Sequence, residues 1–488
     1  MDHFLNNVKN YINENDKKIV HELINFVKVP NDVFDTNQIY ENALFLKKMM
    51  ESRGIEVEIW SSPSGSPLVY GEFISNPDAK TILIYSHFDG VPVETAEWHS
   101  DPYEPVFRER LPFGKGDDWN FLNYEDIDKF EGCYRLFGRS VADSKNAIVA
   151  ILTALDYMKV KDNKPAVNLK FLFDGEEEIE SPNLHRLMEI HRERISCDLV
   201  ISASGETHQS GLPTVELGFR GMLQLDLQVY TMSTDLHSGH FGNFAPNAIQ
   251  RFIHLLSSMK NDSGEVMIKH FYDDVIPLSK SELDAISKIP KIEGKILEQF
   301  SIYEPEMKNK SLQELINLPT FNIRGITGGF VGTSARNIIP SVATAEIDIR
   351  LVHGMDPDKI LHLMIHHIEE QNWTVMFREP SAEELRKHPR IVQIVKKGSF
   401  VATKTPMDTS QAAFVIDSVK RAIGEELVVM PTEGGSLPLY VFQQIGLPVI
   451  GIPTSNFDCN QHTHDENLEL NYFYRAIEIF ASIFLNDF

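Results

Sequence analysis

Short β-rich runs alternate with amphipathic helical segments along the first part of the chain. The spacing of apolar residues predicts helices at 20–27, 40–50, 146–158 and 184–194. Strands are predicted at 56–60, 68–73, 81–85 and 167–173. Alternation of this kind favours a mostly parallel sheet covered by helices. Catalytic residues in such folds gather where strands end and loops begin.

From Gly221 onward the predicted order changes to strand, helix, strand, strand, helix, strand. These elements are expected at 222–230, 246–259, 320–326, 344–351, 356–371 and 374–378. The order βαββαβ is the ferredoxin-like arrangement. The stretch 261–319 is too long for a plain loop and carries a helical pattern, so we expect an extra subdomain there.

The αβ pattern resumes after Pro389, which predicts that the second domain is inserted within the first. The expected fold is α/β, with a mostly parallel catalytic domain formed by residues 1–220 and 381–488. A ferredoxin-like lid domain at 221–380 interrupts it. The length of 488 residues, beyond the size at which one hydrophobic core stops growing, agrees with more than one domain.

Composition argues against several classes of partner. With 46 Lys+Arg against 70 Asp+Glu the formal net charge is -24, and this field repels phosphate backbones, so no nucleic acid is expected. No stretch approaches the roughly 18 apolar residues of a membrane span, and the first residues lack a signal-type apolar run. Three widely separated cysteines argue against a disulfide framework. We therefore expect a cytoplasmic location and no membrane partner.

Imidazole and carboxylate groups follow several predicted strands. The strand TILIYS ends in His87 and Asp89, an arrangement typical of a metal ligand and the group that orients it. Asp143 precedes a predicted helix, where it could also be an N-cap. Each of these residues alone fits an ordinary structural role.

Two further groups strengthen the pattern. The apolar strand NLKFLFD runs into three adjacent carboxylates that include Glu177 and Glu178, and such crowding is costly unless cations or solvent compensate. Near the C-terminus, the strand LPVIGIP leads to a loop that contains His462. A shared metal centre explains all four groups together.

Several motifs occur in one order along the chain. They are SHFDGVPV, LFGRSVADSKNA, FDGEEEIES, ELGFRG, DLHSGHFGN, EGGSLP and HTHDENLEL. In these motifs the sequence resembles the metallopeptidase family that includes carnosine-type and cytosolic nonspecific dipeptidases, aminoacylase and succinyl-diaminopimelate desuccinylase. The resemblance implies two divalent metal ions, zinc first, with manganese or cobalt as alternatives. It also implies a homodimer that forms through the lid domain.

The resemblance assigns the metal ligands. Asp143 would bridge the two ions, His87 would hold one of them, and Glu178 with His462 would hold the other. Asp89 would orient His87.

The resemblance also assigns the groups that act on the substrate. Glu177 would be the general base for a metal-bridging water, whose pKa two divalent ions lower toward neutrality. His237 of DLHSG would reach into a neighbouring subunit's active site and stabilise the oxyanion. The substrate's carboxylate and nearby polar groups would be held by Arg350, Asn337, Gly435 and Ser436.

One departure from the family pattern concerns the first ion. An ungapped match places Ser204 where the dipeptidase branch has an aspartate ligand, and a hydroxyl is a weak ligand for divalent ions. Glu206 follows two residues later, in a Gly-Glu-Thr segment that resembles the glutamate-bearing segment of the desuccinylase branch. Glu206 is therefore predicted to complete the metal shell.

The resemblance favours a dinuclear metallopeptidase that hydrolyses the amide bond of dipeptides or short peptides with a free C-terminal carboxylate. The segment IKHFYDDVIPLSKSELDAI, similar to an insertion of the dipeptidase branch, supports this reading. The segment SGET instead favours a deacylase or desuccinylase of N-acylated amino acids. A noncatalytic ligand-binding member is a third hypothesis, against which Glu177 and Asp143 argue. The side-chain preference and the native metal stay open.

Overall fold

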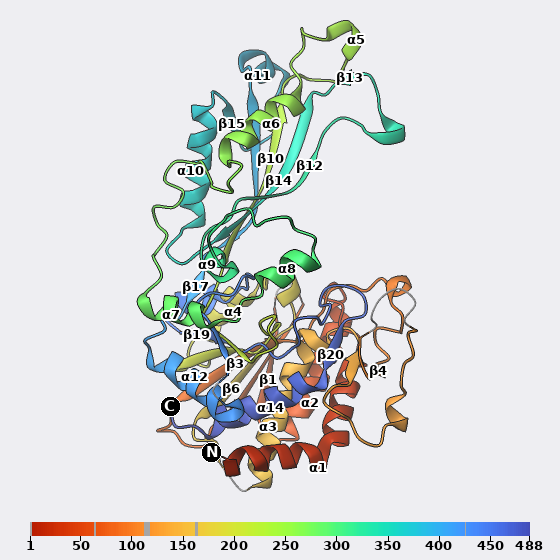
Figure 1. Cartoon of the computed structure of the whole chain (residues 1–488), viewed down its shortest axis with the longest axis vertical. Helices are drawn as coiled ribbons and strands as arrows, with labels where there is room; N and C mark the ends of the chain where they lie inside the picture. The colour runs from red at the N-terminus through yellow and green to blue at the C-terminus, as the bar shows by residue number, and fades with distance from the viewer. Residues whose placement is uncertain (1, 63–64, 112–117, 162–163, 425) are drawn as a thin grey trace.

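The computed structural model describes residues 2–62, 65–111, 118–161, 164–424 and 426–488. The two largest of five sheets organise these residues, one in the lower and one in the upper half of Figure 1. The lower sheet has the strand order β1-β2-β6-β3-β7-β19-β8-β18. Its strands are β1 (Glu56–Trp60), β2 (Leu68–Phe73), β3 (Thr81–His87), β6 (Asn168–Asp174), β7 (Leu199–Ser202), β8 (Thr214–Glu216), β18 (Val428–Met430) and β19 (Val449–Gly451).

The centre of this sheet is parallel and covered by helices on both faces. Strands β6, β3, β7 and β19 are neighbours and run parallel to one another, whereas β1, β2 and β8 add antiparallel pairs. Along β3, Ile82 and Ile84 join one hydrophobic cluster, and Leu83 and Tyr85 join another. This alternation follows from the two-residue period of a strand. The expected α/β class is therefore confirmed.

Helices from both ends of the chain form the two covering layers. The first cluster is built with α1 (Asp2–Val27), α2 (Thr36–Glu51), α3 (Asn146–Val160), α12 (Ser410–Ile423) and α14 (Leu470–Leu485). The second is built with α4 (Leu184–Ile190) and α13 (Tyr440–Gln444). Among the described residues, no helix has the length and apolar character needed to cross a bilayer.

The upper sheet has the order β12-β14-β10-β16-β15. Its strands are β10 (Gly221–Tyr230), β12 (Asn322–Thr327), β14 (Val342–Leu351), β15 (Thr374–Met376) and β16 (Ile391–Phe400). Alternate residues of β10 pack with the apolar faces of α6 (Ala248–Met259) and α10 (Pro357–Glu370) in one cluster. The elements predicted between 222 and 378 are all present.

The expected end of this domain at residue 380 is wrong, because one strand of the sheet lies beyond it. Strand β16 pairs antiparallel with β10 along most of its length, and β15 is an edge strand parallel to β16. Val392 and Ile394 of β16 belong to the hydrophobic cluster of this sheet. The apolar pattern of β16 reveals a strand, but it does not reveal which of two sheets the strand joins.

The stretch 261–319 contains three short helices that lie between the two sheets in Figure 1. They are α7 (Lys280–Lys288), α8 (Glu293–Gln299) and α9 (Leu312–Ile316), and capping boxes begin α7 and α9. The Arg220 guanidinium donates hydrogen bonds to the carbonyl oxygens of Ile316 at 2.7 Å and Leu318 at 2.8 Å. A cation at the carboxyl end of α9 is favourable for the helix dipole, so Arg220 holds the segment in place.

Candidate metal centre

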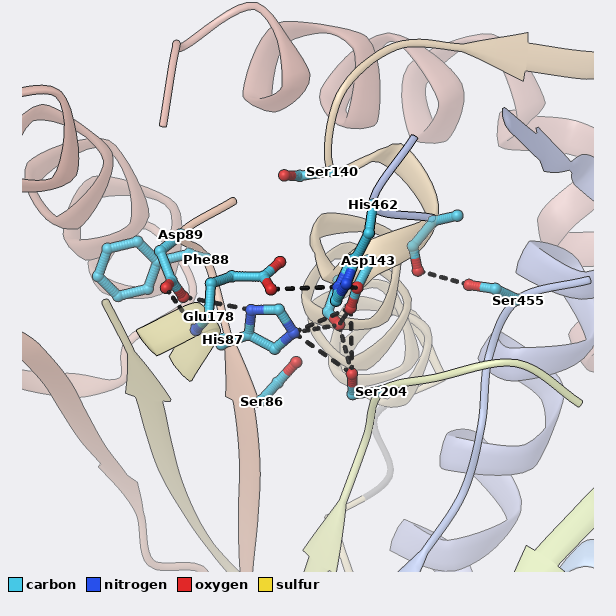
Figure 2. Close-up of polar contacts among 12 residues, drawn as sticks. Ser86, His87, Phe88, Asp89, Ser140, Asp143, Glu178, Ser204, Ser455 and His462 are labelled. Carbon is cyan, nitrogen blue, oxygen red and sulfur yellow. Dashed lines mark hydrogen bonds and ion pairs between the residues drawn. The ribbon is translucent and has the colours of Figure 1, made fainter. Parts of the chain in front are cut away.

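The candidate site lies at the carboxyl ends of the four parallel strands. His87 is the last residue of β3, and Glu177 and Glu178 begin the short turn that follows β6. Ser204 follows β7, and His462 lies in the loop after β19. Because these strands are adjacent and parallel, their ends bring four distant segments together, as Figure 2 shows for His87, Glu178, Ser204 and His462.

The carboxylate of Asp143 lies between two imidazoles. Its Oδ1 is 3.0 Å from His87 Nε2, and its Oδ2 is 3.0 Å from His462 Nε2 (Figure 2). His462 Nε2 is also 3.1 Å from Glu178 Oε2. Donor atoms of His87, Asp143 and Glu178 all lie within 4.8 Å of one another, a separation that suits ligands of one metal ion. Imidazole and carboxylate are the ligand types that zinc, manganese and cobalt accept.

Burial and close pairing shift the pKa values of these groups strongly. Hydrogen bonds to Asp143 and Glu178 raise the pKa of His462 to about 11. Burial alone would raise the pKa of Asp143, but the hydrogen bonds with His462 and His87 hold it below its ordinary value. Burial, aided by the charge of Glu178, raises the pKa of Glu177 to about 8. Protons thus hold the cluster together where a divalent cation could replace them.

Asp89 contacts two residues of the cluster, His87 and Glu178. Its Oδ1 lies 3.2 Å from His87 Nδ1, and its Oδ2 accepts a hydrogen bond of 2.9 Å from the backbone N–H of Glu178. This pairing turns the other ring nitrogen of His87 toward Asp143. It is the contact that the predicted orienting role requires.

Glu466 holds the turn that carries Asp143, a role that the sequence did not reveal. Its buried carboxylate accepts hydrogen bonds from the backbone N–H groups of Ser140, Ala142 and Asp143 at 2.9–3.0 Å. Arg139 donates a further hydrogen bond of 2.8 Å to it. The motif HTHDENLEL shows that Glu466 lies near His462. It does not show whether the carboxylate of Glu466 binds a metal or backbone N–H groups.

On the His87 side of Asp143, two hydroxyl groups lie beside the ring nitrogen of His87. Ser144 Oγ lies 2.9 Å from His87 Nε2 and 2.6 Å from Ser204 Oγ. Ser204 Oγ is 3.4 Å from the same ring nitrogen. The described residues thus fit one divalent ion, with His87, Asp143 and Glu178 mutually close and His462 in contact with Asp143 and Glu178. Among the described residues, Asp143 supplies the carboxylate oxygen in contact with His87 Nε2, and the other contacts of this nitrogen are hydroxyl groups.

Glu206 lies in the same cavity but does not join the metal-binding cluster. Its backbone forms a bridge with Ser455, and its carboxylate accepts a hydrogen bond of 3.3 Å from the thiol of Cys459. The residues whose donor atoms lie within 4.8 Å of one another are His87, Asp143 and Glu178, and Glu206 is not among them. The ligand role of Glu206 stays a prediction that this placement does not support.

Arg350, Gly435 and Ser436 line a cavity of about 490 Å³ that opens beside the metal cluster. Arg350 comes from β14 of the upper sheet, and its Nη1 donates a hydrogen bond of 2.7 Å to Ser436 Oγ in the lower domain. Ile292 and Leu312 of the 261–319 segment also line this cavity, which the sequence did not indicate. The cavity therefore lies between the two domains, with the inserted helices at its wall.

His237 and Asn337 lie elsewhere. His237 is exposed in β11 (Leu236–His237), which pairs with β13 (Ile338–Ile339). Asn337 is exposed beside it, and its carbonyl oxygen accepts a hydrogen bond of 2.9 Å from the N–H of Ser238. Figure 1 places β13 and α5 (Ser238–Phe241) at the end of the molecule farthest from the lower sheet. Two predicted substrate-site residues are thus together, but remote from the cavity of their own chain.

Comparison with known proteins agrees with this geometry. The model of peptidase family M20/M25/M40 matches residues 83–486. The chain belongs to this family. It is 26% identical over 428 residues to a Cys-Gly metallodipeptidase of Schizosaccharomyces pombe, covering 85% of this chain and 82% of that protein. It is 24% identical over 432 residues to the Beta-Ala-His dipeptidase of Homo sapiens, covering 86% and 77%.

Solved structures share the whole architecture. An M20 family metallo-carboxypeptidase from Sulfolobus solfataricus superposes with a TM-score of 0.78 at 26% identity, covering 96% of this chain and 98% of the other. Human carnosine dipeptidase 1 superposes with a TM-score of 0.75 at 21% identity, covering 99% and 98%, which shows a common fold. The resemblance inferred from the motifs is therefore confirmed at the level of the family.

Replacing Glu178 by Ala should lower the zinc content of the purified protein, because it removes a carboxylate from the cluster around Asp143. Glu206→Ala is the matched control, since it removes a carboxylate from the same cavity but outside the cluster. Zinc per chain would be measured by mass spectrometry after dialysis, with circular dichroism to verify the fold. An equal loss of zinc in both variants would make Glu206 a ligand and contradict its placement.

Proposed function

We propose that this chain is a metal-dependent dipeptidase that cleaves the amide bond of dipeptides or short peptides with a free C-terminal carboxylate. The observation that carries the proposal is the presence of the metal-binding cluster and Arg350 in one cavity. The names of the relatives, a Cys-Gly metallodipeptidase and a Beta-Ala-His dipeptidase, support the same substrate class. Three free cysteines suit the reducing cytoplasm in which we place it.

His87, Asp143, Glu178 and His462 would hold the metal, zinc first and manganese or cobalt as alternatives. Bound there, a divalent ion polarises the scissile carbonyl and lowers the pKa of water toward neutrality. Asp89 keeps His87 oriented for this task. We also propose that the site binds two metal ions, as the family resemblance implies. Its second ion relies on His87, on Asp143 and on hydroxyl groups.

Glu177 would move the proton. Glu177 directly precedes the ligand Glu178 and lines the cavity, so its carboxyl group belongs to the site that a substrate would enter. Burial raises its pKa to about 8 in the metal-free site, and a divalent ion bound beside it would lower that pKa and keep the carboxylate ionised, as a general base requires. The carboxylate would accept a proton from water and pass it to the amine that leaves when the amide bond breaks.

Arg350 would fix the substrate's C-terminal carboxylate. Its guanidinium faces the cavity and already contacts the hydroxyl of Ser436, so both donors converge on one place. Guanidinium binds carboxylate through two parallel hydrogen bonds, which sets orientation as well as affinity. Gly435 lines the cavity beside them, and its backbone N–H donates a hydrogen bond to Glu433.

A homodimer would complete the site. His237 and Asn337 cannot serve the cavity of their own chain from the far end of the upper domain, so we assign them to the cavity of a partner. The same end exposes Phe244 by 86% and Val331 by 85%. Strand β12 is an exposed sheet edge. Exposed apolar side chains and an open edge suit contact with a second copy.

Glu177→Gln should lower turnover by roughly two or more powers of ten while metal content and fold are kept, because Gln cannot accept the proton. The measurement compares both proteins on a panel of dipeptides and a matched panel of N-acylated amino acids. The wild-type enzyme should prefer the dipeptides. Preference for the N-acylated amino acids would make it a deacylase, and near-normal turnover of metallated Glu177→Gln would reject the general base.

Mixing two inactive variants tests the shared site. A His237→Ala chain and a Glu177→Gln chain, mixed equally and allowed to exchange subunits, should recover about a quarter of wild-type activity, since half of the dimers then hold one intact site. Native mass spectrometry, which resolves the small mass difference between the two variants, would verify exchange. Absence of recovery despite exchange would place His237 outside the partner's site.

Ser204→Asp should tighten the binding of the second ion, because it adds a carboxylate near His87 Nε2 in place of a hydroxyl group. Calorimetric titration of metal-free protein would show a second tight binding event in the variant. Ser204→Asn, which adds similar bulk without charge, is the control. Two equally tight events in the wild-type protein would show that the hydroxyls suffice.

A further inference from the structure

A row of three residues crosses the upper sheet beside the cavity. Met222 of β10 lies directly opposite Arg350 of β14 on one side and Phe400 of β16 on the other. Side chains directly opposite one another in antiparallel strands lie on the same face of the sheet, with Cβ atoms about 4.5–5.5 Å apart. All three residues line the cavity, so two apolar side chains lie next to the guanidinium of Arg350.

This row belongs to the face of the sheet that is turned away from α6 and α10. The neighbouring residues on the same two strands, Leu223 and Ile349, are opposite each other and join the hydrophobic cluster of those helices. Successive residues of a strand point to opposite faces. Met222 and Arg350 therefore point away from the helices and toward the cavity that they line.

Contacts behind the cavity wall hold the two apolar side chains in place. Gln224 Nε2 lies 3.0 Å from Met222 Sδ. The ring of Phe400 stacks on that of Tyr440 in α13, with centroids 5.5 Å apart and an angle of 8° between the planes. Met222 is 4% exposed and Phe400 is 7% exposed, so packing fixes both side chains as a firm part of the wall.

The row runs from the proposed carboxylate anchor toward the metal cluster. Gly398 of β16 lies against Glu180, because a Cβ built on this glycine would be 3.2 Å from Glu180 Oε2. Glu180 ends the turn Glu177–Ile179 that follows β6. Strand β16 thus borders the metal cluster, and β10 lies between it and β14. Met222 therefore lies between the anchor Arg350 and the strand beside the cluster.

We propose that Met222 and Phe400 form an apolar subsite for the side chain of the substrate's C-terminal residue, which makes the enzyme prefer dipeptides ending in a bulky apolar residue such as leucine. The inference rests on the proposed function, in which Arg350 binds the substrate's carboxylate. The side chain of that residue branches from the carbon that bears the carboxylate, so it reaches the neighbour of Arg350 in the row. Contact with this wall removes apolar surface from water.

An acidic neighbour offers an alternative occupant, a cationic side chain. Glu433 lies at the same end of the cavity, where its carboxylate accepts a hydrogen bond from the N–H of Gly435. Burial raises the pKa of Glu433, and the nearby Arg220 and Arg350 act against this rise. These arginines would repel a second cation, whereas the thioether and the ring in the row suit an apolar group.

The test compares four dipeptides on the metal-loaded enzyme. Alanyl-leucine and alanyl-asparagine have C-terminal side chains of similar size, alanyl-lysine carries a cation, and alanyl-glycine has no side chain at this position. The subsite predicts a kcat/KM for alanyl-leucine roughly tenfold or more above that for each of the others, as burial of a leucine side chain allows. Most of the gap should lie in KM, because the contact is made in the ground state and in the transition state alike.

Met222→Gln, which keeps the length of the side chain but makes it polar, should bring the leucine-to-asparagine ratio close to one. Phe400→Ala serves as a second variant if Met222→Gln does not fold, with circular dichroism as the check. Met430→Gln is the matched control, because Met430 is a methionine of similar burial, 5% exposed, that lines the same cavity from β18 of the lower sheet. Its ratio should equal that of the wild-type enzyme.

Equal kcat/KM values for the four dipeptides, or a highest value for any of them except alanyl-leucine, would overturn the apolar subsite and leave the dipeptidase proposal standing. A highest value for alanyl-lysine would assign the side chain to Glu433 instead. A wild-type ratio that survives in folded Met222→Gln and Phe400→Ala would overturn the subsite too. Hydrolysis of none of the four would remove the proposed function together with the inference that rests on it.

Discussion

The shared carboxylate of Asp143 is the interaction on which the rest of the site depends. It holds His87 on one oxygen and His462 on the other, two residues from opposite ends of the catalytic domain. Glu466 fixes the backbone around Asp143, and Asp89 fixes His87 and Glu178 from the other side. Such a concentration of charge inside a protein is stable only when protons or metal ions balance it.

The parallel order of β6, β3, β7 and β19 explains why these residues meet. Each strand is an apolar run that can be buried on both faces, so polar side chains accumulate only where the strands end. The sequence shows those runs and the groups that follow them, and the family motifs add their order. That is why His87, Asp143, Glu178 and His462 were predicted together from the sequence, and why the α/β class was predicted too.

Other features required the folded chain. Strand β16 has an ordinary apolar pattern, and only its pairing with β10 shows that it extends the upper sheet. Glu206 has the carboxylate of a metal ligand, but in the folded chain this carboxylate accepts a hydrogen bond from Cys459. The direction of its side chain cannot be read from the motif. The row of Arg350, Met222 and Phe400 beside the cavity depends on three strands from distant parts of the chain. Long-range pairing of this kind leaves no local signal.

The central claim is that the cluster around Asp143 is a metal centre. Diffraction from crystals grown with zinc, recorded on both sides of the zinc absorption edge, tests it most directly. The account predicts an anomalous peak about 2.0–2.2 Å from a carboxylate oxygen of Asp143 and from the ring nitrogen of His462. A peak elsewhere in the chain at saturating zinc, with Asp143 still hydrogen-bonded to both imidazoles, would contradict it.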